Sequence, residues 1–277
     1  MRNKKTSKFT LSPFCIVRSD PCFTIKRLAF NVKTQTRVQL NETGYIILRI
    51  LENNSLTVDN LKYLLSKETD PSYSVAIADF IANMLRDGFI INSDKVIGAI
   101  SNYQPKEFRD INIPITSTPY EVEIHLTLAC NMRCIHCAYD AGEPLTNELK
   151  LEDWQKVIAE LEKLRVLRLI ISGGEPFVFR NIRKLLNCMV SKRIRIDILT
   201  NGSLIDKDIA RRLNSPNLSI TVSLDGATKQ THENFRRVEC FDKIINGIQV
   251  LAENNVVFHL SAVLHKKTLK KSKQWLN

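Results

Sequence analysis

The pattern of apolar and polar residues changes near residue 120. Beyond that point, short apolar runs rich in β-branched residues alternate with stretches whose apolar residues recur at helical spacing. The runs are 121–129, 168–172, 195–200, 218–224 and 256–264, and the clearest helical stretches are 151–164 and 241–254. Repeated strand–helix units predict an α/β fold with a parallel sheet, open or rolled into a barrel. The strands are near-continuously apolar, which is typical of strands covered by helices on both faces.

Residues 12–92 show a different pattern. β-rich pieces around 14–40 precede three helical stretches, at 41–53, 57–67 and 72–88. Asn41 and Thr57 are suited to cap helix N-termini, and Gly88 is suited to end a helix. This order predicts a small α+β domain of the winged-helix type. A linker over 93–119 follows it, because that segment holds three prolines and no clear period.

The formal net charge of +11 is distributed unevenly along the chain. Residues 1–40 carry +8 and residues 266–277 carry +5, which leaves −2 for residues 41–265. We therefore expect no nucleic-acid partner for the main body. There is no apolar run of about 18 residues and no secretory segment at the start, so we expect a cytoplasmic protein without a membrane partner.

Seven cysteines occur, and three of them, Cys130, Cys134 and Cys137, lie within eight residues directly after the first strand of the predicted sheet. An odd, clustered set favours a reducing compartment and metal ligation over disulfides. The C-x3-C-x2-C spacing lets three thiolates converge on one centre. A [4Fe-4S] cluster normally takes four cysteines, so three leave one iron open for a small molecule. The alternative is a zinc knuckle, but structural zinc usually draws two separated pairs of ligands, and no second pair is near.

Further motifs stand at the ends of the next three strands: Gly173-Gly174-Glu175, Thr200-Asn201 and Ser223-Leu224-Asp225. The carboxyl ends of parallel strands meet at one edge, where sites gather. Paired glycines let the backbone approach a ligand, and a carboxylate accepts hydrogen bonds from an ammonium group. We therefore expect Gly174→Val to weaken ligand binding, by entering the ligand's space, while leaving the iron content unchanged.

These residues resemble the radical S-adenosylmethionine (radical SAM) superfamily, whose signature is C-x3-C-x-aromatic-C, with His136 at the aromatic place. The resemblance covers 120–277 and implies a partial (βα) barrel with two cofactors, a [4Fe-4S] cluster and S-adenosylmethionine. In that family, an electron from a donor such as ferredoxin or flavodoxin breaks a C–S bond of S-adenosylmethionine, and the resulting radical removes a hydrogen atom from the substrate. The resemblance implies Cys130, Cys134 and Cys137 as metal ligands. It implies contacts to S-adenosylmethionine from His136, Gly173, Gly174, Glu175, Thr200, Asn201, Ser223 and Asp225.

Two features depart from the family pattern. The family writes Arg-Gly where this chain has Arg236-Arg237, so Arg236 is only weakly implied as a site residue. A family barrel has six strands, and the peptide-modifying (SPASM or twitch) branch continues into a cysteine-rich domain. We therefore expect 120–277 to be a core truncated after its fifth strand.

Residues 12–92 resemble the PqqD-like recognition element of ribosomal peptide biosynthesis, which implies a precursor (leader) peptide as partner, bound as an added strand. A winged-helix DNA-binding domain competes with this interpretation, but the stretch 72–88 has Arg86 as its only basic residue. Our hypothesis is an enzyme that installs a thioether or carbon–carbon crosslink, or an epimerised residue, in a ribosomally synthesised peptide. The alternatives are an inactive barrel that binds a leader peptide or DNA, and a maturase of a folded protein.

The remaining candidates receive ordinary interpretations. We expect Cys15, Cys22, Cys188 and Cys240 to be thiols without a metal. His125 and His259 lie in predicted strands, and we expect them to be partly exposed or hydrogen-bonded rather than ligands.

Overall fold

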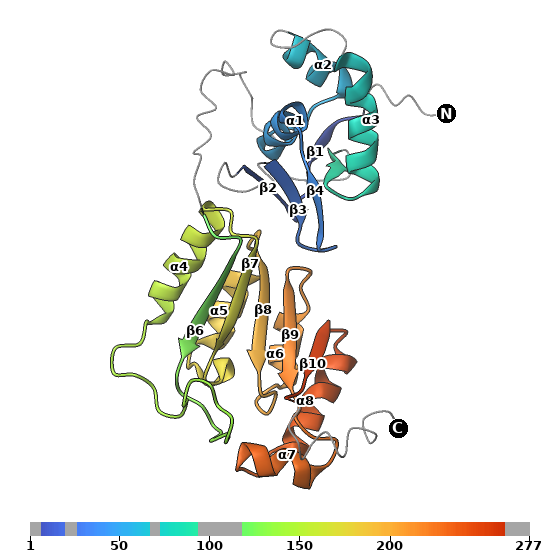
Figure 1. Ribbon diagram of the computed structural model, residues 1–277. Coiled ribbons are helices and arrows are strands. Elements are labelled where there is room, and N and C mark those ends of the chain that lie inside the picture. Colours follow the sequence, from blue (N-terminus) through green and yellow to red (C-terminus); the bar gives the residue numbers. More distant parts are fainter. Residues whose placement is uncertain (1–6, 20–26, 67–72, 94–117, 264–277) are drawn as a thin grey trace. The chain divides into compact units, whose positions relative to one another are not determined.

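The computed structural model describes residues 7–19, 27–66, 73–93 and 118–263. The chain forms two compact units, Met1–Thr118 and Pro119–Asn277, and each is described by itself (Figure 1). Cys22 and most of the predicted linker (94–117) lie outside the described residues, as does 264–277.

The described residues of the front unit form two small antiparallel sheets. One pairs β2 (Cys15–Ser19), β3 (Arg27–Asn31) and β4 (Thr36–Gln39) in that order, and the other pairs β1 (Phe9–Leu11) with β5 (Ile90–Asn92). β1 lies ahead of residue 12, where the sequence pattern places the start of this domain. Among the described strands, β4 has a neighbour on one side only.

The described part of this unit also has three helices: α1 (Glu42–Asn53), α2 (Val58–Ser66) and α3 (Tyr73–Arg86). The Asn41 side chain accepts a hydrogen bond from the Gly44 N–H at 2.8 Å, and Thr57 Oγ1 accepts one from the Asn60 N–H at 3.1 Å. Both side chains satisfy donors that a helix start leaves free, which confirms the two predicted caps.

Gly88 ends α3 as predicted. It takes a left-handed φ of +74°, and the following Phe89 N–H returns to the Met84 carbonyl. This ending favours glycine because the left-handed region carries a steric cost for residues with a Cβ. The apolar faces of the three helices then form one core with the strands, which includes Ile47, Leu48, Leu51, Leu61, Ile81 and Ile90.

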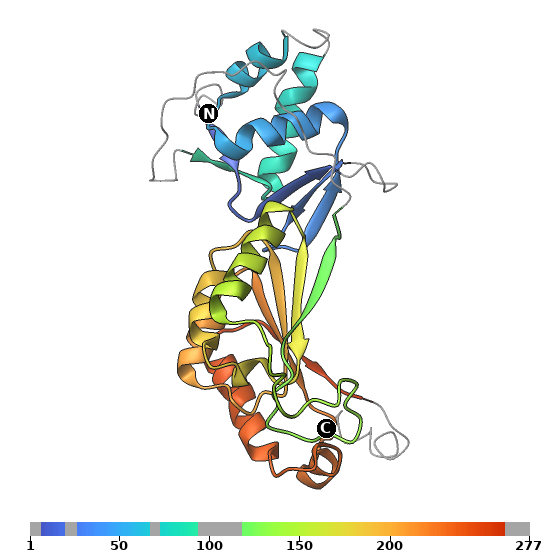
Figure 2. The same ribbon diagram turned by 90° about the vertical axis from the view of Figure 1, so that its left-hand side faces the viewer.

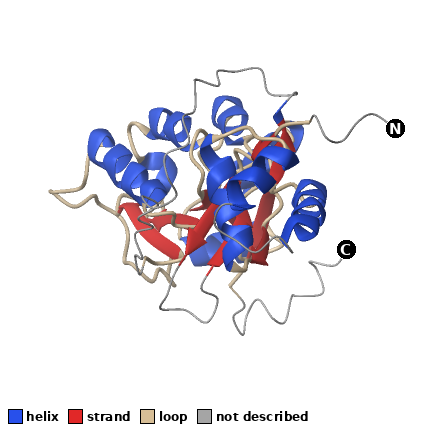
Figure 3. Cartoon of the chain, turned by 90° about the horizontal axis from the view of Figure 1, so that it is seen from above, coloured by secondary structure: helices blue, strands red, loops and turns tan. Residues whose placement is uncertain are grey.

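The described residues of the rear unit, 119–263, form a five-stranded parallel sheet whose strands lie side by side in chain order. The strands are β6 (Glu121–Thr127), β7 (Arg168–Gly173), β8 (Arg195–Thr200), β9 (Leu218–Ser223) and β10 (Phe258–Ser261). The helices are α4 (Leu151–Lys163), α5 (Ile182–Met189), α6 (Lys207–Leu213), α7 (Lys229–Arg236) and α8 (Phe241–Glu253), with a short 3-10 helix η3 (Pro176–Val178) after β7. All five predicted strands are present, and Figure 3 distinguishes them in red from the helices in blue.

The helices of the rear unit cover one face of its sheet. Figure 2 shows α4, α5, α6 and α8 along that face. On β7, Leu169 and Ile171 are fully buried beneath the helices, whereas Arg168 on the other face contacts Glu121 and Asp197. The expectation of helices on both faces is therefore wrong for the described part of this unit. Strands wound in chain order by right-handed crossovers bring every helix to the same side.

No helix within the described ranges is long and apolar enough to cross a bilayer.

Candidate active site

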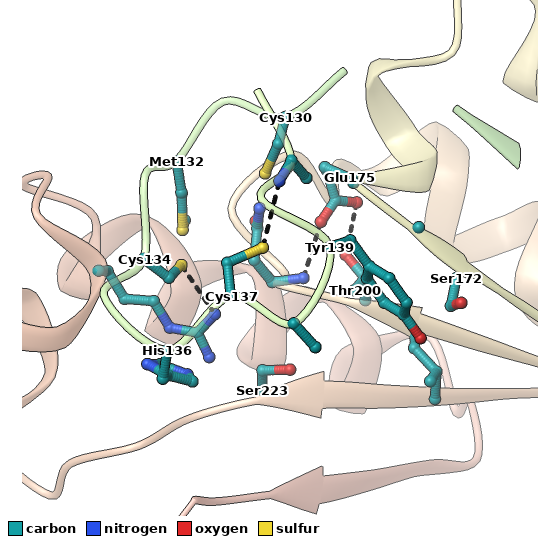
Figure 4. A pocket seen from close by; sticks show the side chains of 17 residues that line it. Cys130, Met132, Cys134, His136, Cys137, Tyr139, Ser172, Glu175, Thr200 and Ser223 are labelled. Carbon is teal, nitrogen blue, oxygen red and sulfur yellow. Dashed lines mark hydrogen bonds between the residues drawn. The ribbon is translucent and has the colours of Figure 1, made fainter. Parts of the chain in front are cut away.

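A pocket of about 240 Å³ lies where the carboxyl ends of β7, β8 and β9 meet the loop after β6 (Figure 4). Its lining includes most of the side chains that the sequence singles out: Cys130, Cys134, His136, Cys137, Gly173, Gly174, Glu175, Thr200, Asn201 and Ser223. Motifs that are far apart in the chain meet here because parallel strands end at a common edge.

The three cysteines lie on one irregular loop between β6 and α4, which we call the cysteine loop (128–148). Its backbone folds back on itself through hydrogen bonds from the Cys130 N–H to the Gly142 carbonyl and from the Gly142 N–H to the Leu128 carbonyl, both 2.9 Å. The Ala141 N–H donates to Cys137 Sγ at 3.3 Å. The loop therefore positions Cys130 and Cys137 through main-chain hydrogen bonds rather than through a helix or strand.

Glu148 ties the two ends of the cysteine loop together. Its carboxylate accepts hydrogen bonds from the Leu128 and Leu145 N–H groups and from the Thr127 hydroxyl, at 2.7 to 3.0 Å. Partial burial raises the pKa of Glu148, but these donors outweigh it and hold the pKa below its ordinary value. Sequence reasoning missed this residue because it belongs to no motif.

The protonation of Cys130 depends on its surroundings. Burial raises the pKa of its thiol, Glu175 and the other two cysteines raise it further, and a backbone hydrogen bond from Met132 offsets part of the rise. A thiolate at this position would therefore gain stability from a positively charged group placed beside it. Within the described ranges, no three Cys, His, Asp or Glu side chains converge closely enough for a single metal ion. An iron–sulfur cubane needs a different arrangement, because its cysteines bind separate irons.

The paired glycines pack against the cysteine loop. Gly173 has a φ of +109°, and a Cβ on Gly174 would lie 2.2 Å from the Ala129 carbonyl oxygen. The Gly174 N–H also donates to the Thr127 carbonyl at 2.7 Å. A side chain at Gly174 would therefore meet the backbone of the cysteine loop at its Cβ, a contact that the sequence pattern did not indicate. It would displace the backbone beside Cys130, so the expectation of an unchanged iron content does not fit this contact.

Glu175 is a buried carboxylate, 1% exposed. It accepts hydrogen bonds from the Thr200 hydroxyl and the Asn201 N–H, both 2.7 Å, and from the Phe177 N–H at 3.1 Å. Burial raises the pKa of Glu175, and these donors together with the Arg236 charge lower it without cancelling the rise. A positively charged ligand group in the pocket would favour the ionised form.

Asp225 does not line the pocket but supports two side chains that do. Its buried Oδ2 lies 2.8 Å from Arg236 Nη2 and 3.2 Å from His136 Nε2. Arg236 Nη1 also donates to Cys134 Sγ at 3.4 Å. The weakly implied Arg236 is thus part of the pocket wall, between a carboxylate and a cysteine.

Arg237, which stands where the family pattern has glycine, takes a left-handed conformation, with φ +55° and ψ +30°. It ends α7, and its N–H donates to the Glu233 carbonyl at 2.8 Å. The backbone that favours glycine is therefore retained here with an arginine.

His232 lies fully buried behind Asp225. Its Nδ1 accepts a hydrogen bond from the Asp225 N–H at 3.1 Å. Burial and the nearby Arg236 charge lower the pKa of His232 to about 4. The neutral imidazole therefore acts as an acceptor that fixes the backbone of Asp225.

The pocket residues fit a cluster with a polar ligand beside it. The three thiols share one pocket with the carboxylate of Glu175. Two buried atoms of pocket-lining side chains, His136 Nδ1 and Arg236 Nε, have no hydrogen-bond partner among the described residues. Such atoms are costly to bury unless a ligand satisfies them.

The pocket wall also contains residues that sequence reasoning did not assign: Met132, Tyr139, Ser172 and Leu199. Each of them lies within two residues of a predicted site residue in the sequence. That closeness in sequence is the only feature that could have identified them as pocket residues in advance. Asn131 connects the cysteine loop to the end of β8 by accepting from Asn201 Nδ2 at 2.8 Å.

Among the described residues, Cys15, Cys188, Cys240, His125 and His259 do not line the pocket. Cys15 and Cys240 are buried, Cys188 is partly exposed on α5, and none of the three is in a disulfide. His259 is exposed on β10, and His125 is partly exposed beside Tyr139.

Residues 124–274 match the model of the Radical SAM superfamily. The AdoMet-dependent heme synthase of Methanosarcina barkeri is 30% identical over 165 residues, covering 57% of this chain and 46% of that protein. The sporulation killing factor maturation protein SkfB of Bacillus subtilis is 26% identical over 212 residues, covering 76% of this chain and 45% of that protein. The chain thus spans about half the length of these curated relatives.

A solved structure, Streptococcus suis SuiB bound to precursor peptide SuiA, is similar with a TM-score of 0.70 and 18% identity. The match covers 97% of this chain and 60% of that one, so it includes both units. At this identity the likeness concerns the fold.

Proposed function

Because the chain belongs to the radical SAM superfamily, whose members use a [4Fe-4S] cluster and S-adenosylmethionine, we propose that it modifies a ribosomally synthesised peptide. Cys130, Cys134 and Cys137 hold the cluster in this proposal. When bound, the two cofactors supply a carbon-centred radical that removes a hydrogen atom from the substrate. The modification is a thioether crosslink, a carbon–carbon crosslink or an epimerisation.

The observation that carries the proposal is the common pocket of the three thiols and the buried Glu175. Glu175 is the acceptor for the ammonium group of S-adenosylmethionine, because its carboxylate is already oriented by Thr200 and Asn201. Arg236 provides a positive charge on the same wall for the carboxylate of the cofactor. Met132 and Leu199 add apolar lining that limits water.

The other implied residues orient the cofactor or the loop around it. His136 and Ser223 line the pocket, and Asp225 holds His136 from behind. Gly173 and Gly174 allow the strand end to pack on the cysteine loop. These roles remain proposals for each residue.

Iron content and cofactor cleavage test the core of the proposal. Anaerobically reconstituted protein should bind about four irons, as one cubane requires, and should release 5′-deoxyadenosine when reduced with S-adenosylmethionine. Cys134→Ala should lose both properties. Cys188→Ala is the matched control, because Cys188 lies on α5 away from the pocket and should keep both. Stoichiometric zinc without iron–sulfur absorbance would contradict the assignment.

The front unit is proposed as a PqqD-like element that binds the precursor peptide along β4. The Leu40 N–H donates to the Arg27 carbonyl, so Leu40 directs its backbone groups toward β3. In an antiparallel pair, residues that bond to the partner strand alternate with residues that do not. Arg37 and Gln39 therefore direct their backbone N–H and C=O groups away from β3. β4 has no described neighbour on that side. An extended peptide can therefore add there through main-chain hydrogen bonds.

Arg37→Pro tests strand addition without breaking the existing sheet. Proline removes the outward N–H of residue 37 and spares the bonds that β4 makes to β3. Binding of the precursor peptide encoded beside the gene, measured by fluorescence anisotropy, should weaken sharply in Arg37→Pro and little in Arg37→Ala. Binding should persist in Cys134→Ala. Tight binding of duplex DNA with no peptide binding would favour the winged-helix alternative.

Similarity to the Methanosarcina barkeri heme synthase makes a heme precursor the second candidate substrate. The match to the heme synthase covers 57% of the chain, whereas the match to SkfB covers 76%. The rear unit alone is shorter than the segment matched to SkfB, so that match also includes part of the front unit. The front unit therefore favours the peptide. We place the reaction in the cytoplasm, where a ferredoxin or flavodoxin provides the electron and thiols stay reduced.

A further inference from the structure

Four side chains from three elements meet beside the pocket, and we call them the Glu123 cluster. Glu123 and His125 belong to β6, Tyr139 to the cysteine loop and Ser172 to β7. Ser172 Oγ and Tyr139 Oη donate to Glu123 Oε1 at 2.5 and 3.2 Å, and His125 Nε2 lies 3.8 Å from the same oxygen. Tyr139 and Ser172 also line the pocket, so the cluster adjoins the space proposed for S-adenosylmethionine.

The cluster lies on the face of the sheet that the helices leave uncovered. Ile124 and Leu126 alternate with Glu123 and His125 along β6 and are buried in the core under the helices. The Glu123 side chain is 42% exposed and that of His125 is 40% exposed. The carboxylate is therefore accessible from the open face.

The arrangement is also held firmly. The His125 ring packs edge-on against the Tyr139 ring, with centroids 4.2 Å apart. On its other side His125 abuts Gly173, where an added Cβ would lie 3.1 Å from His125 Cβ. Two donors fix Glu123 Oε1, and among the described residues none donates to Oε2. The second oxygen thus remains available in a fixed direction.

Glu123 differs from the neighbouring acidic residues because it has no described lysine or arginine partner. Glu121 and Asp197 form ion pairs with Arg168, and Asp225 forms one with Arg236. Within the described ranges, no Lys or Arg lies within ion-pair distance of Glu123, and its neighbour His125 is charged only when protonated. A carboxylate that is oriented but lacks a permanent cation partner is suited to receive one from a ligand.

Building on the proposed function, we propose that the Glu123 cluster is a substrate subsite that binds a cationic side chain, lysine or arginine, of the peptide. Glu123 Oε2 accepts hydrogen bonds from the ammonium or guanidinium group. The Tyr139 ring beside Glu123 offers additional contact to the aliphatic stem and its charge. The subsite would hold the peptide next to the pocket in which the radical forms.

The test uses the reconstituted 277-residue chain and measures binding without turnover. The probes are Nα-acetyl-lysine amide and the matched Nα-acetyl-norleucine amide, which lacks the charge, compared by saturation-transfer NMR. The lysine probe should bind more tightly, and Glu123→Gln should weaken its binding about tenfold, which corresponds to about 1.4 kcal/mol. Glu121→Gln is the matched control: it removes a carboxylate two residues earlier on the same face, one already paired with Arg168, and should change the affinity little.

A second variant keeps the test decisive if Glu123→Gln folds poorly. Tyr139→Phe retains the ring beside His125 but removes one donor to Glu123, and it should weaken the lysine probe by a smaller factor. Equal affinity for the two probes, no binding of the lysine probe, or equal losses in Glu121→Gln and Glu123→Gln would overturn the subsite. Iron content and 5′-deoxyadenosine release report separately on the proposed function, so the two failures are distinguishable.

Discussion

Gly174 lies in backbone contact with Ala129, so close that a Cβ on Gly174 would meet the Ala129 carbonyl oxygen at 2.2 Å. The Glu175 N–H donates to that same carbonyl at 2.9 Å. Ala129 directly precedes Cys130. The end of β7 is therefore part of the support for the first cysteine.

This contact predicts that Gly174→Ala loses iron. The added methyl group cannot be accommodated without moving the backbone beside Cys130, because its obstacle is a main-chain carbonyl. Iron assay and visible absorbance should show much less than one cluster per chain. Gly142→Ala is the control in the same loop: its Cβ meets the flexible end of the Arg133 side chain, which can move. Full iron loading in Gly174→Ala would show that the loop tolerates displacement.

Glu148→Ala should destabilise the rear unit by about 1 to 3 kcal/mol, because it leaves the donors on Thr127, Leu128 and Leu145 without their acceptor. The folded-state pKa of Glu148 is lowered, so its stabilisation is present above the unfolded pKa and is lost as pH falls through the folded value. Urea unfolding at neutral and acidic pH should show a difference between wild type and variant that shrinks in acid. Glu143→Ala removes an exposed ion pair with Arg133 and should cost little.

His232 should make the rear unit sensitive to mild acid. Burial and Arg236 lower its pKa from 6.5 to about 4. Below about pH 6.5 this histidine binds a proton in the unfolded chain, whereas in the folded chain it stays neutral down to about pH 4. The free energy of unfolding is therefore highest above pH 6.5 and decreases as the pH falls toward the folded-state pKa. The unfolding free energy of His232→Gln should depend less steeply on pH in this window. His259→Gln, at an exposed position, should keep the wild-type slope. Parallel slopes for all three proteins would exclude His232 as the source.

Arg237→Gly should stabilise the protein by about 1 kcal/mol, because glycine takes the left-handed conformation without the steric cost of a Cβ. Thermal or urea unfolding of the reconstituted protein would measure the gain. Asn234→Gly, within α7 and exposed, should destabilise by a few tenths of a kcal/mol and controls for glycine in this helix. A loss of stability in Arg237→Gly would mean that the arginine side chain contributes more than its backbone costs.

The strands, the helix caps and the composition of the pocket were predictable because each depends on local pattern. Asn41 and Gly88 stand at helix ends for reasons that a few neighbouring residues determine. Strand ends in a parallel sheet must converge, which brings Glu175 and Thr200 together. The one-sided helix cover was not predictable from apolar runs, because such runs do not reveal whether the second face is covered by helices or left open.

The contacts between the motifs and residues outside any motif could not be predicted from the sequence either. Glu148 reaches back to Thr127, and Arg236 reaches Cys134, through distances that only the folded loop defines. His125, which the pattern assigns to an ordinary strand position, belongs to the Glu123 cluster because Tyr139 folds over it.

The alternation along β6 divides its side chains between the core under the helices and the open face of the sheet. Ile124 and Leu126 hold the sheet to its helices, so exchanging them costs folding free energy. Glu123 and His125, between and beside them, contribute no side chain to that core. A substitution on the open face can therefore change the groups that this face presents to a ligand without removing a side chain from the core under the helices.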